Sequence, residues 1–393
     1  MDIFKKCFEW DDAKAVIRRG IYPYFRPIEG TEGTEVIIDG HRAIMIGSNN
    51  YLGLTTHPKV REAARKALET YGPSCTGSRF LNGTLAIHHE LEARLAAFMG
   101  KPSALVFSTG MQTNLGAISA LVGRDDLVVV DKDDHASIVD ACRLSYGETK
   151  RFVHGDLEQL ERILEKADKN KGILVVVDGV FSMGGDIADL PAIVKTCKKH
   201  GARLYVDDAH AIGVLGKGRG TAAHFGLSDE VDITMGTFSK SFASLGGFVV
   251  GDADVIDWIK HMARSFIFSA SLPASNAMAA LAALEVMETE PEHVEKLWDN
   301  ARFMLKGLRE LGFNTGNTET PIIPVIVGED ALCFGFWKAL LEAGLYTNPV
   351  VSPGVPVGMA LLRTSYMATH TREQLERALE IFEKVGKKLA VIA

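Results

Sequence analysis

Lys240 is the residue of this sequence whose surroundings most clearly indicate chemistry. It is the only charged residue between positions 233 and 251, in the stretch ITMGTFSKSFASLGGFVVG. An ammonium group in apolar surroundings loses hydration, which lowers its pKa and makes the neutral amine, a nucleophile for aldehydes, accessible. The hydroxyl groups of Thr237, Ser239 and Ser241 would suit an anionic phosphate beside this amine. A lysine that reaches solvent from a loop is the simpler alternative.

A second candidate group follows the apolar run at 204–206, where Asp207 and Asp208 precede His210. If this run is a strand, Asp207 at its carboxyl end can pair with a protonated ring nitrogen while His210 reaches a neighbouring oxygen. Helix capping by an aspartate is an alternative that needs no chemistry. A nucleotide hydrolase is excluded, because the sequence has no G-x-x-x-x-G-K-[ST] loop and the segment GKG at 216–218 lacks the hydroxyl residue.

His135 follows another apolar run, at 127–130, in the segment DKDDHASI that starts at Asp131. Its ring could stack on a flat cofactor or assist proton transfer. The clusters at 131–135 and 207–210 could instead form the carboxylate–histidine site of a metal-dependent hydrolase. Their acids outnumber their histidines and no H-x-x-x-H spacing occurs, so we expect no metal.

Two glycine-containing segments complete the candidate site. In FSTGMQTN, Gly110 and Met111 lie where a predicted strand leads into a predicted helix, a geometry that suits a phosphate. The other segment, DGVFSMGGD, contains Ser182. Glycine at a strand–helix junction is often only a turn, so neither segment is decisive alone.

Short apolar runs alternate with helical patterns between about residues 100 and 251. Strands are predicted at 104–107, 127–130, 173–177, 204–206, 233–235 and 248–250, with helices between several of them, for example at 157–166 and 190–199. Strands that are apolar on both faces and separated by helices predict an α/β fold with a mainly parallel sheet between helices. Ligands bind such sheets at the carboxyl ends of the strands, where the candidate residues fall.

The remaining sequence predicts two smaller parts. Helical patterns continue to about residue 312 and are followed by strands at 321–327 and 358–363 and by a final amphipathic helix, whose apolar positions are Leu375, Leu379, Phe382, Val385 and Leu389. We therefore expect an N-terminal arm with a helix over 1–45, a large domain over 46–290 and a smaller α+β domain over 291–393.

Composition and charge exclude several classes of protein. The 393 residues carry 43 Lys and Arg against 50 Asp and Glu, a net charge of −7 without a dense basic run, which argues against nucleic acid as a partner. The 5 scattered cysteines form no C-x-x-C pair, which fits the reducing cytoplasm and argues against a structural zinc site.

No secretory signal or membrane span is predicted. The N-terminus mixes acids and bases and is typical of a short amphipathic helix with Phe4, Phe8 and Ile17 as its apolar contacts. The uncharged stretch 265–284 contains four serines and Pro273, which favours a helix that starts near this proline and is buried in protein.

Taken together, the candidate residues indicate one kind of site. A lone lysine among hydroxyls, a strand-end aspartate with a histidine three residues later, a second histidine after another strand and a glycine turn opening a helix are the parts of a pyridoxal 5′-phosphate site. They supply a covalent anchor, a pyridinium partner, a ring-stacking group and a phosphate loop.

The sequence resembles the α-oxoamine synthases, fold-type I pyridoxal-phosphate enzymes that condense an amino acid with an acyl-CoA and release carbon dioxide. The resemblance covers nearly the whole chain, from YFRPIEG to RTSYMATHT. It includes the segments SNNYLGL, GSRFLNGTLAIHHELE, FSTGMQTNLG, DHASI, DGVFSMGGD, VDDAHAIGVLG, GTFSKSFASLGG and NPVVSPGVP, in the family's order. Met111 is a departure, since many members carry an aromatic residue there.

The resemblance implies a role for each candidate residue. Lys240 would bind the cofactor covalently, Asp207 would pair with the pyridine nitrogen, His210 would bond the phenolic oxygen and His135 would stack on the ring. Ser182 would contact the ring. The phosphate would be held by Gly110, Met111, Thr237 and Ser239. Substrate would be bound by Arg363, which receives its carboxylate, by His135, and by Asn49 and Ser78, partly from the neighbouring subunit.

The resemblance further implies a homodimer with a shared active site. The segments YFRP and GSRFLNGTLAIH most resemble family members that join L-serine to palmitoyl-CoA and form 3-ketodihydrosphingosine. Glycine with acetyl-CoA, cysteate with a fatty acyl-CoA, and 8-amino-7-oxononanoate synthesis remain alternatives with the same chemistry. A non-catalytic subunit is disfavoured because Lys240 is present, and peripheral membrane contact is left open.

Overall fold

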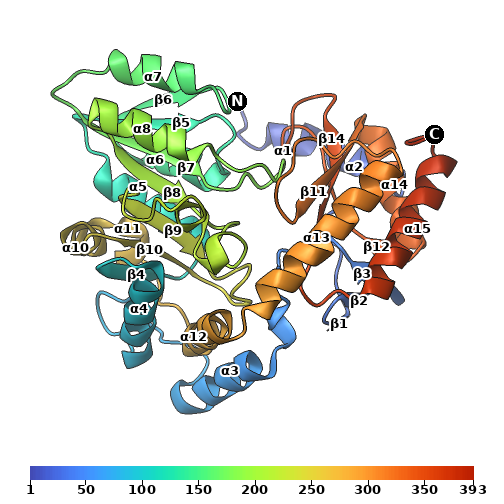
Figure 1. Ribbon diagram of the computed structural model, residues 1–393, viewed down its shortest axis with the longest axis horizontal. Helices are drawn as coiled ribbons and strands as arrows, with labels where there is room; N and C mark the ends of the chain where they lie inside the picture. The colour runs from blue at the N-terminus through green and yellow to red at the C-terminus, as the bar shows by residue number, and fades with distance from the viewer.

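The computed structural model describes residues 1–393, which form a large α/β unit and a C-terminal unit beside it (Figure 1). The large unit contains a seven-stranded sheet in the order β4-β10-β9-β8-β7-β5-β6. β10 is antiparallel to both of its neighbours, whereas β9, β8, β7, β5 and β6 are parallel to one another. The strands are β4 (Ser103–Phe107), β5 (Asp126–Asp131), β6 (Glu148–Phe152), β7 (Gly172–Asp178), β8 (Arg203–Asp207), β9 (Ile233–Thr237) and β10 (Gly247–Gly251).

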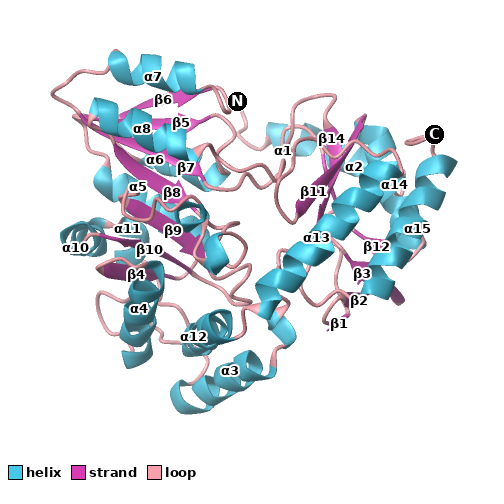
Figure 2. Ribbon diagram, viewed as in Figure 1, coloured by secondary structure: helices cyan, strands magenta, loops and turns pink.

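Helices cover both faces of this sheet (Figure 2). One face packs against α5 (Gly110–Leu121), α6 (Ala136–Leu144), α10 (Ala253–Met262) and α11 (Arg264–Ile267). The other packs against α7 (Leu157–Glu165) and α8 (Leu190–His200), and at its far end against α4 (Ala86–Met99) and α12 (Ala274–Thr289), with α3 (Pro58–Tyr71) outside them. Val128 and Val130 enter one core while Leu127 and Val129 enter the other, which explains the continuous apolar run in β5.

The C-terminal unit is built on two small sheets. β11 (Ile322–Gly328), β14 (Ala360–Ser365) and β13 (Asn348–Val350) form one sheet, and β12 (Leu345–Tyr346) joins β1 (Gly30–Glu32), β2 (Glu35–Ile38) and β3 (His41–Met45) in the other. Helices α13 (Glu292–Glu310), α14 (Asp330–Glu342) and α15 (Arg372–Lys388) pack on them. Residues 30–46 pack with this unit, whereas the expected division into 1–45, 46–290 and 291–393 separates them from it. The short elements are η1 (Leu54–Thr56), η2 (Gly216–Gly218) and α9 (Thr221–His224).

Most predicted elements are confirmed. The six predicted strands of the large sheet are all present, each extended by one or two residues, and the strands predicted at 321–327 and 358–363 are β11 and β14. The helix predicted to start near Pro273 is α12, with Pro273 as its N-cap. β6 was not predicted, because this edge strand has the sequence ETKRF and only Phe152 is buried. None of the helices has the length and apolar content that a membrane-spanning segment requires.

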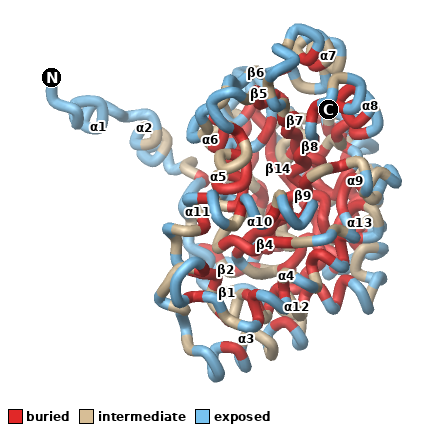
Figure 3. The backbone as a smooth tube through the Cα atoms, turned by 90° about the vertical axis from the view of Figure 1, so that its left-hand side faces the viewer, coloured by how far each residue is buried: buried red, intermediate tan, exposed pale blue.

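The N-terminus differs from its prediction. Two short helices, α1 (Lys5–Glu9) and α2 (Asp12–Arg18), replace the single helix. Phe4, Phe8 and Ile17 were expected to make apolar contacts, but they are 61%, 75% and 54% exposed. Both helices stand away from the rest of the chain (Figure 3), so they have no apolar surface of their own chain to cover.

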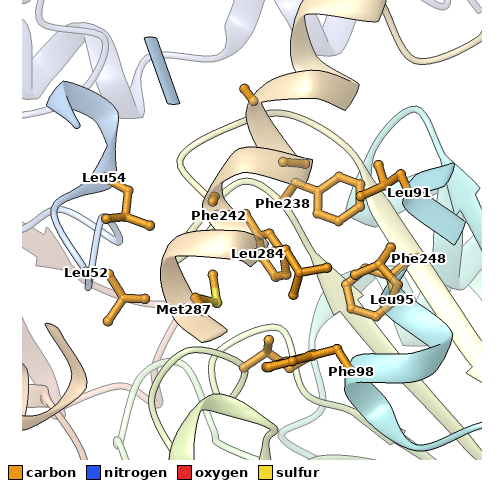
Figure 4. Close-up of a cluster of buried hydrophobic side chains, with 14 of the residues drawn as sticks. Leu52, Leu54, Leu91, Leu95, Phe98, Phe238, Phe242, Phe248, Leu284 and Met287 are labelled. Carbon is orange, nitrogen blue, oxygen red and sulfur yellow. The ribbon is translucent and has the colours of Figure 1, made fainter. Parts of the chain in front are cut away.

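A cluster of buried aromatic side chains anchors the loop between β9 and β10. Phe238 and Phe242 pack on each other and on Phe248 of β10, with ring centroids 5.1–6.1 Å apart. Their other neighbours come mainly from α4 and α12 and include Leu91, Leu95, Phe98, Leu284 and Met287 (Figure 4). Because both phenylalanines are fully buried, the loop is fixed on either side of Lys240.

Candidate active site

A cavity of about 280 Å³ lies at the carboxyl ends of the parallel strands. It is lined by Thr109, Gly110, Met111, Asn114, His135, Ser137, Asp178, Val180, Asp207, Ala209, His210, Met235, Thr237, Ser239 and Lys240. Eight of the residues singled out in the sequence thus meet in one place, although they come from four different strand ends. This is the edge of an α/β sheet at which ligands bind.

Asp207 ends β8 and is fixed by two hydrogen bonds. Its Oδ2 accepts from the side-chain amide of Asn114 at 2.7 Å, and its Oδ1 accepts from the backbone N–H of Ala209 at 2.9 Å. Asn114 is in turn held by Tyr205, whose hydroxyl donates to its amide oxygen at 2.8 Å. The carboxylate is 4% exposed, so its negative charge is directed at the cavity by neighbours that leave it little freedom.

Asp208 points to the opposite side of the strand end and lies outside the cavity. Its Oδ2 accepts from the backbone N–H of Thr221 at the start of α9, at 2.9 Å. Burial raises the pKa of Asp208 to about 7. The two adjacent acids therefore differ in their surroundings: Asp207 lines the cavity, whereas Asp208 binds the backbone of Thr221.

Lys240 enters the cavity from the loop that Phe238 and Phe242 anchor. Its side chain is partly buried, and the loss of hydration lowers its pKa to about 8 against the opposing attraction of Asp207. At neutral pH an appreciable fraction of this amine is unprotonated, unlike that of a surface lysine.

The start of α5 offers hydrogen-bond donors to the same cavity. The hydroxyl of Thr109 caps the helix by accepting from Gln112 N at 3.1 Å, which leaves the N–H groups of Gly110 and Met111 free of a side-chain cap. Gly110 is required here, because a Cβ atom would lie 2.8 Å from the Thr237 hydroxyl oxygen. Ser239 N donates to that oxygen at 3.3 Å. Helix-end N–H groups beside hydroxyls make an anion-binding site.

His135 is the N-cap of α6 and is exposed at the cavity wall. Its Nδ1 accepts from Ser137 N at 3.2 Å, and the backbone N–H of His135 donates to Asp178 Oδ2 at 3.1 Å. Asp178 N donates to Asp134 Oδ1 at 2.8 Å. Burial raises the pKa of Asp134 and that of Asp178 well above the ordinary value of an aspartate. The negative charge of Asp207 raises both further, together with that of Asp131 for Asp134 and that of Asp134 for Asp178.

His210 belongs to a buried chain of polar groups that extends away from the cavity. Its Nδ1 lies 2.7 Å from the hydroxyl of Tyr51, and Nη2 of Arg363 donates to the same hydroxyl at 3.4 Å. Nε of Arg363 donates to the backbone oxygen of Ser182 at 2.5 Å, which places Ser182 and Arg363 beside each other. Asn49 lies at the same point, with its Oδ1 at 3.5 Å from the Tyr51 hydroxyl.

Two residues of this site were missed in the sequence. Tyr51 lies in the segment SNNYLGL and Asn114 in FSTGMQTN, both of which were noted for other residues. Neither has a spacing that marks it, because each acts through a partner far away in the chain.

Residues 42–382 match the family described as aminotransferase class I and II. The chain belongs to this family. A serine palmitoyltransferase of Sphingobacterium spiritivorum is 51% identical over 374 residues, which cover 95% of this chain and 94% of the relative. An 8-amino-7-oxononanoate synthase of Thermoanaerobacter pseudethanolicus is 44% identical over 95% of both chains. The resemblance to the α-oxoamine synthases is confirmed.

Solved structures confirm the fold of this class I and II family member. A serine palmitoyltransferase of S. paucimobilis with a bound PLP–myriocin aldimine superimposes with a TM-score of 0.96 at 38% identity, and all of both chains is covered. The predicted fold-type I architecture, with its mixed, mostly parallel sheet, is therefore correct.

Ser78 lies apart from the cavity of its own chain. It is in the loop between α3 and α4, where its backbone oxygen accepts from Leu81 and Gly83 and its hydroxyl is buried without a partner. The acids considered for metal binding are also dispersed, since Asp131 faces His154, not His135. Groups of three side chains with convergent ligand atoms occur elsewhere, at His57, Glu290 and His293 and at Glu161, Glu165 and His200.

Proposed function

We propose that this protein is a pyridoxal-phosphate-dependent C-acyltransferase that condenses L-serine with palmitoyl-CoA, releasing carbon dioxide and CoA and forming 3-ketodihydrosphingosine. One observation carries the proposal: the Lys240 amine, the Asp207 carboxylate and the start of α5 line the same cavity. Similarity to the serine palmitoyltransferase of Sphingobacterium spiritivorum, at 51% identity, favours this pair of substrates over the alternatives.

The residues present fit the cofactor. Lys240 would bind its aldehyde, Asp207 its ring nitrogen, His210 its phenolic oxygen and His135 the face of its ring. Its phosphate would be held by the N–H groups of Gly110 and Met111 and the hydroxyls of Thr237 and Ser239, with Ser182 near the ring. When bound, pyridoxal phosphate supplies an electron sink that stabilises negative charge on the substrate Cα.

Lys240 is also the proposed base of the reaction. With a pKa of about 8, its amine can both take up and release a proton near neutral pH, which is the condition for efficient proton transfer. Asp207 would support this role indirectly, because its fixed charge would keep the ring nitrogen of the cofactor protonated.

Arg363 is the proposed receptor of the substrate carboxylate. It is 5% exposed, and its contacts with Ser182 and Tyr51 hold the guanidinium plane in one orientation. A fixed guanidinium can bind a carboxylate with two parallel hydrogen bonds, which orients the substrate and so selects the bond that breaks. Asn49, which lies at the Tyr51 hydroxyl, would contact the substrate beside it.

We further propose that two chains form a cytoplasmic homodimer with shared active sites. The loop of Ser78 presents Phe80 and Leu81, which are 57% and 78% exposed. Ser271 N donates to Gly77 O of this loop, and Phe268, three residues before Ser271, is 76% exposed. Apolar side chains of this size on a free surface are typical of a subunit interface. All five cysteines are free, in keeping with a reducing compartment.

Spectral titration of the purified holoprotein tests the function. L-Serine, glycine and L-cysteate are added separately and the cofactor absorbance is followed, and each complex is then challenged with palmitoyl-CoA or acetyl-CoA. We expect a saturable response to L-serine and product release only with the long-chain thioester. A preference for glycine with acetyl-CoA, or for cysteate, would assign the alternative reaction, and a protein without cofactor absorbance would overturn the proposal altogether.

A further inference from the structure

A second cluster of potential ligands lies at the corner where α3, α12 and α13 meet. His57 immediately precedes α3, Glu290 immediately follows α12 and His293 lies in the first turn of α13. One carboxylate oxygen of Glu290, Oε2, is 3.4 Å from Nε2 of His57 and 3.5 Å from Nε2 of His293. The three ligand atoms all lie within 4.8 Å of one another.

The backbone holds these side chains in place. His57 is confined to an extended conformation, with φ −66° and ψ 129°, because Pro58 follows it. His57 N donates to Leu54 O, and His293 N donates to Glu290 O across the turn that joins α12 to α13. Two ligands therefore come from one tight turn, and the third comes from a distant segment that is packed against it.

The surroundings of the cluster are half-buried. The side chains of His57, Glu290 and His293 are only 16%, 24% and 18% exposed, so the ligand atoms are partly shielded from water but reachable from it. Nδ1 of His57 is buried without a hydrogen-bond partner. The carboxylate oxygen that both histidines approach is 3.4–3.5 Å from their Nε2 atoms, which is longer than the 2.7–3.2 Å of an N–H···O hydrogen bond.

We propose that His57, Glu290 and His293 bind a divalent transition-metal ion of the zinc type. Two imidazole nitrogens and one carboxylate oxygen form a ligand set of zinc, which completes four-coordination with water. Imidazole ligands disfavour magnesium and calcium, which prefer oxygen. The two nitrogen–oxygen distances, 3.4 and 3.5 Å, are already near the separation of about 3.3–3.4 Å between ligand atoms that bonds of about 2.0–2.1 Å produce at a tetrahedral ion.

This site could not be recognised in the sequence, since its ligands are neither cysteines nor closely spaced histidines.

The site lies where a bound ion would affect the structure. α12 belongs to the core of the large unit, whereas α13 leaves this corner and crosses to the C-terminal unit (Figure 1). A bound ion would tie the start of α3 to the turn between these helices, at the junction of the two units.

The positive charge of Lys59 competes with a metal ion for the carboxylate of Glu290. Its Nζ donates to the other carboxylate oxygen of Glu290, Oε1, at 2.7 Å, and thus places a positive charge beside the site. Removing that charge should strengthen metal binding, whereas removing a ligand should weaken it. Opposite effects of these two changes on metal affinity would distinguish a metal site from a simple cluster of polar side chains.

Competition between the metal-free holoprotein and a chromophoric chelator for Zn²⁺ tests the proposal, together with the melting temperature with and without Zn²⁺. We expect one ion per chain and a higher melting temperature with zinc, since the ion binds the folded state. His57→Ala and His293→Gln should each lower the zinc affinity by more than about 100-fold, beyond what loss of an indirect contact causes. Lys59→Met should raise it.

His200→Ala is the matched control. His200 lies in the other convergent cluster, with Glu161 and Glu165, and its removal should leave the zinc affinity unchanged. Zinc binding that is absent from the wild type, that survives both ligand substitutions, or that is lost in His200→Ala would overturn the assignment. His293→Gln retains a side chain able to bond Glu290, so a folding defect in one variant does not prevent the test.

Discussion

The hydroxyl of Tyr51 lies 2.7 Å from Nδ1 of His210, while Nη2 of Arg363 donates to the same hydroxyl. The hydroxyl accepts from Arg363, and we assign its own proton to the histidine because Nδ1 at 2.7 Å is much nearer than Asn49 Oδ1 at 3.5 Å. Burial, together with the charges of Lys240 and Arg363, lowers the pKa of His210 well below its ordinary value, so the ring is neutral. Nδ1 therefore accepts from Tyr51, and the ring proton is on Nε2, where it can donate to a ligand oxygen.

Tyr51→Phe should consequently impair the reaction without disturbing the fold. The ring of Tyr51 is 1% exposed and phenylalanine retains its shape, but His210 is no longer held in one tautomer. We expect kcat to fall about 5- to 30-fold, equivalent to roughly 1–2 kcal/mol. Tyr366→Phe is the control, because it removes a similarly buried hydroxyl that contacts Thr364 away from the cavity. Equal effects of the two substitutions on kcat would contradict the role given to Tyr51.

Asp207→Asn should preserve the structure and remove the charge that faces the cofactor ring. Asparagine can still accept the bond from Ala209 N, while its amide nitrogen cannot accept from Asn114, so the strand end keeps one of its two bonds and should remain folded. We expect Cα hydrogen exchange of L-serine, followed by NMR in deuterated water, to slow by at least about 100-fold. Asp232→Asn is the control: Asp232 binds Leu204 N at the opposite end of β8. Near-normal exchange in Asp207→Asn would refute the assignment.

The strands and helices of the large unit could be read from the sequence because their apolar patterns are local. β5 and β7 each contain three consecutive valines, and the cores on both faces of the sheet require them. Polar edge strand β6 lacked such a pattern, and so did the split between α1 and α2. A periodic pattern of apolar residues indicates that side chains are buried, and few side chains of these segments are buried.

The residues of the candidate site likewise divide into those that a local sequence pattern marks and those that it does not. Lys240, Asp207 and Gly110 were found because each stands out within a few residues of sequence. Tyr51 and Asn114 were not, because their roles depend on hydrogen bonds to residues 159 and 93 positions away. Long-range polar contacts of this kind exist only after the sheet has formed.

Arg363→Lys should weaken amino-acid binding while leaving the cofactor in place. Lysine keeps the charge but cannot make two parallel hydrogen bonds or hold the contact with Ser182 O. We expect the KM for L-serine to rise about 10- to 100-fold, in line with the roughly 1.5–3 kcal/mol of hydrogen bonds to charged groups. Arg309→Lys provides the comparison, since Arg309 binds Thr315 in the C-terminal unit. An unchanged KM together with full cofactor occupancy would exclude the carboxylate role.

Lys240 should destabilise the cofactor-free protein at neutral pH. Its pKa is lowered from 10.5 to about 8, so between these values the unfolded chain binds more protons and stability rises with pH. We expect apoprotein carrying Lys240→Met to be more stable than the wild type at pH 7, by about 1–3 kcal/mol, and this advantage to shrink toward pH 10.5. Melting temperatures at both pH values measure it. The exposed Lys195→Met should show no such trend, and an advantage independent of pH would contradict the prediction.

His154 should contribute stability with the opposite pH dependence. Its ring bridges Asp131 and Asp186, with its nitrogens 3.2 and 3.0 Å from their carboxylates, and these bonds raise its pKa to about 10. A raised pKa stabilises the fold fully below about pH 6.5, and the contribution is lost as the pH rises through 10. Since the side chain is 34% exposed, solvent screening limits the effect to about 1–2 kcal/mol.

His154→Gln should therefore lower the melting temperature at pH 6 and have little effect near pH 10. The bridge joins the ends of β5 and β6 to the loop that carries Ser182, so the same variant should also raise the KM for L-serine through the displaced Ser182–Arg363 contact. His261→Gln is the comparison, because His261 faces a single exposed acid, Asp257. A loss of stability in His154→Gln that is as large at pH 10 as at pH 6 would show that the histidine acts by shape and not by charge.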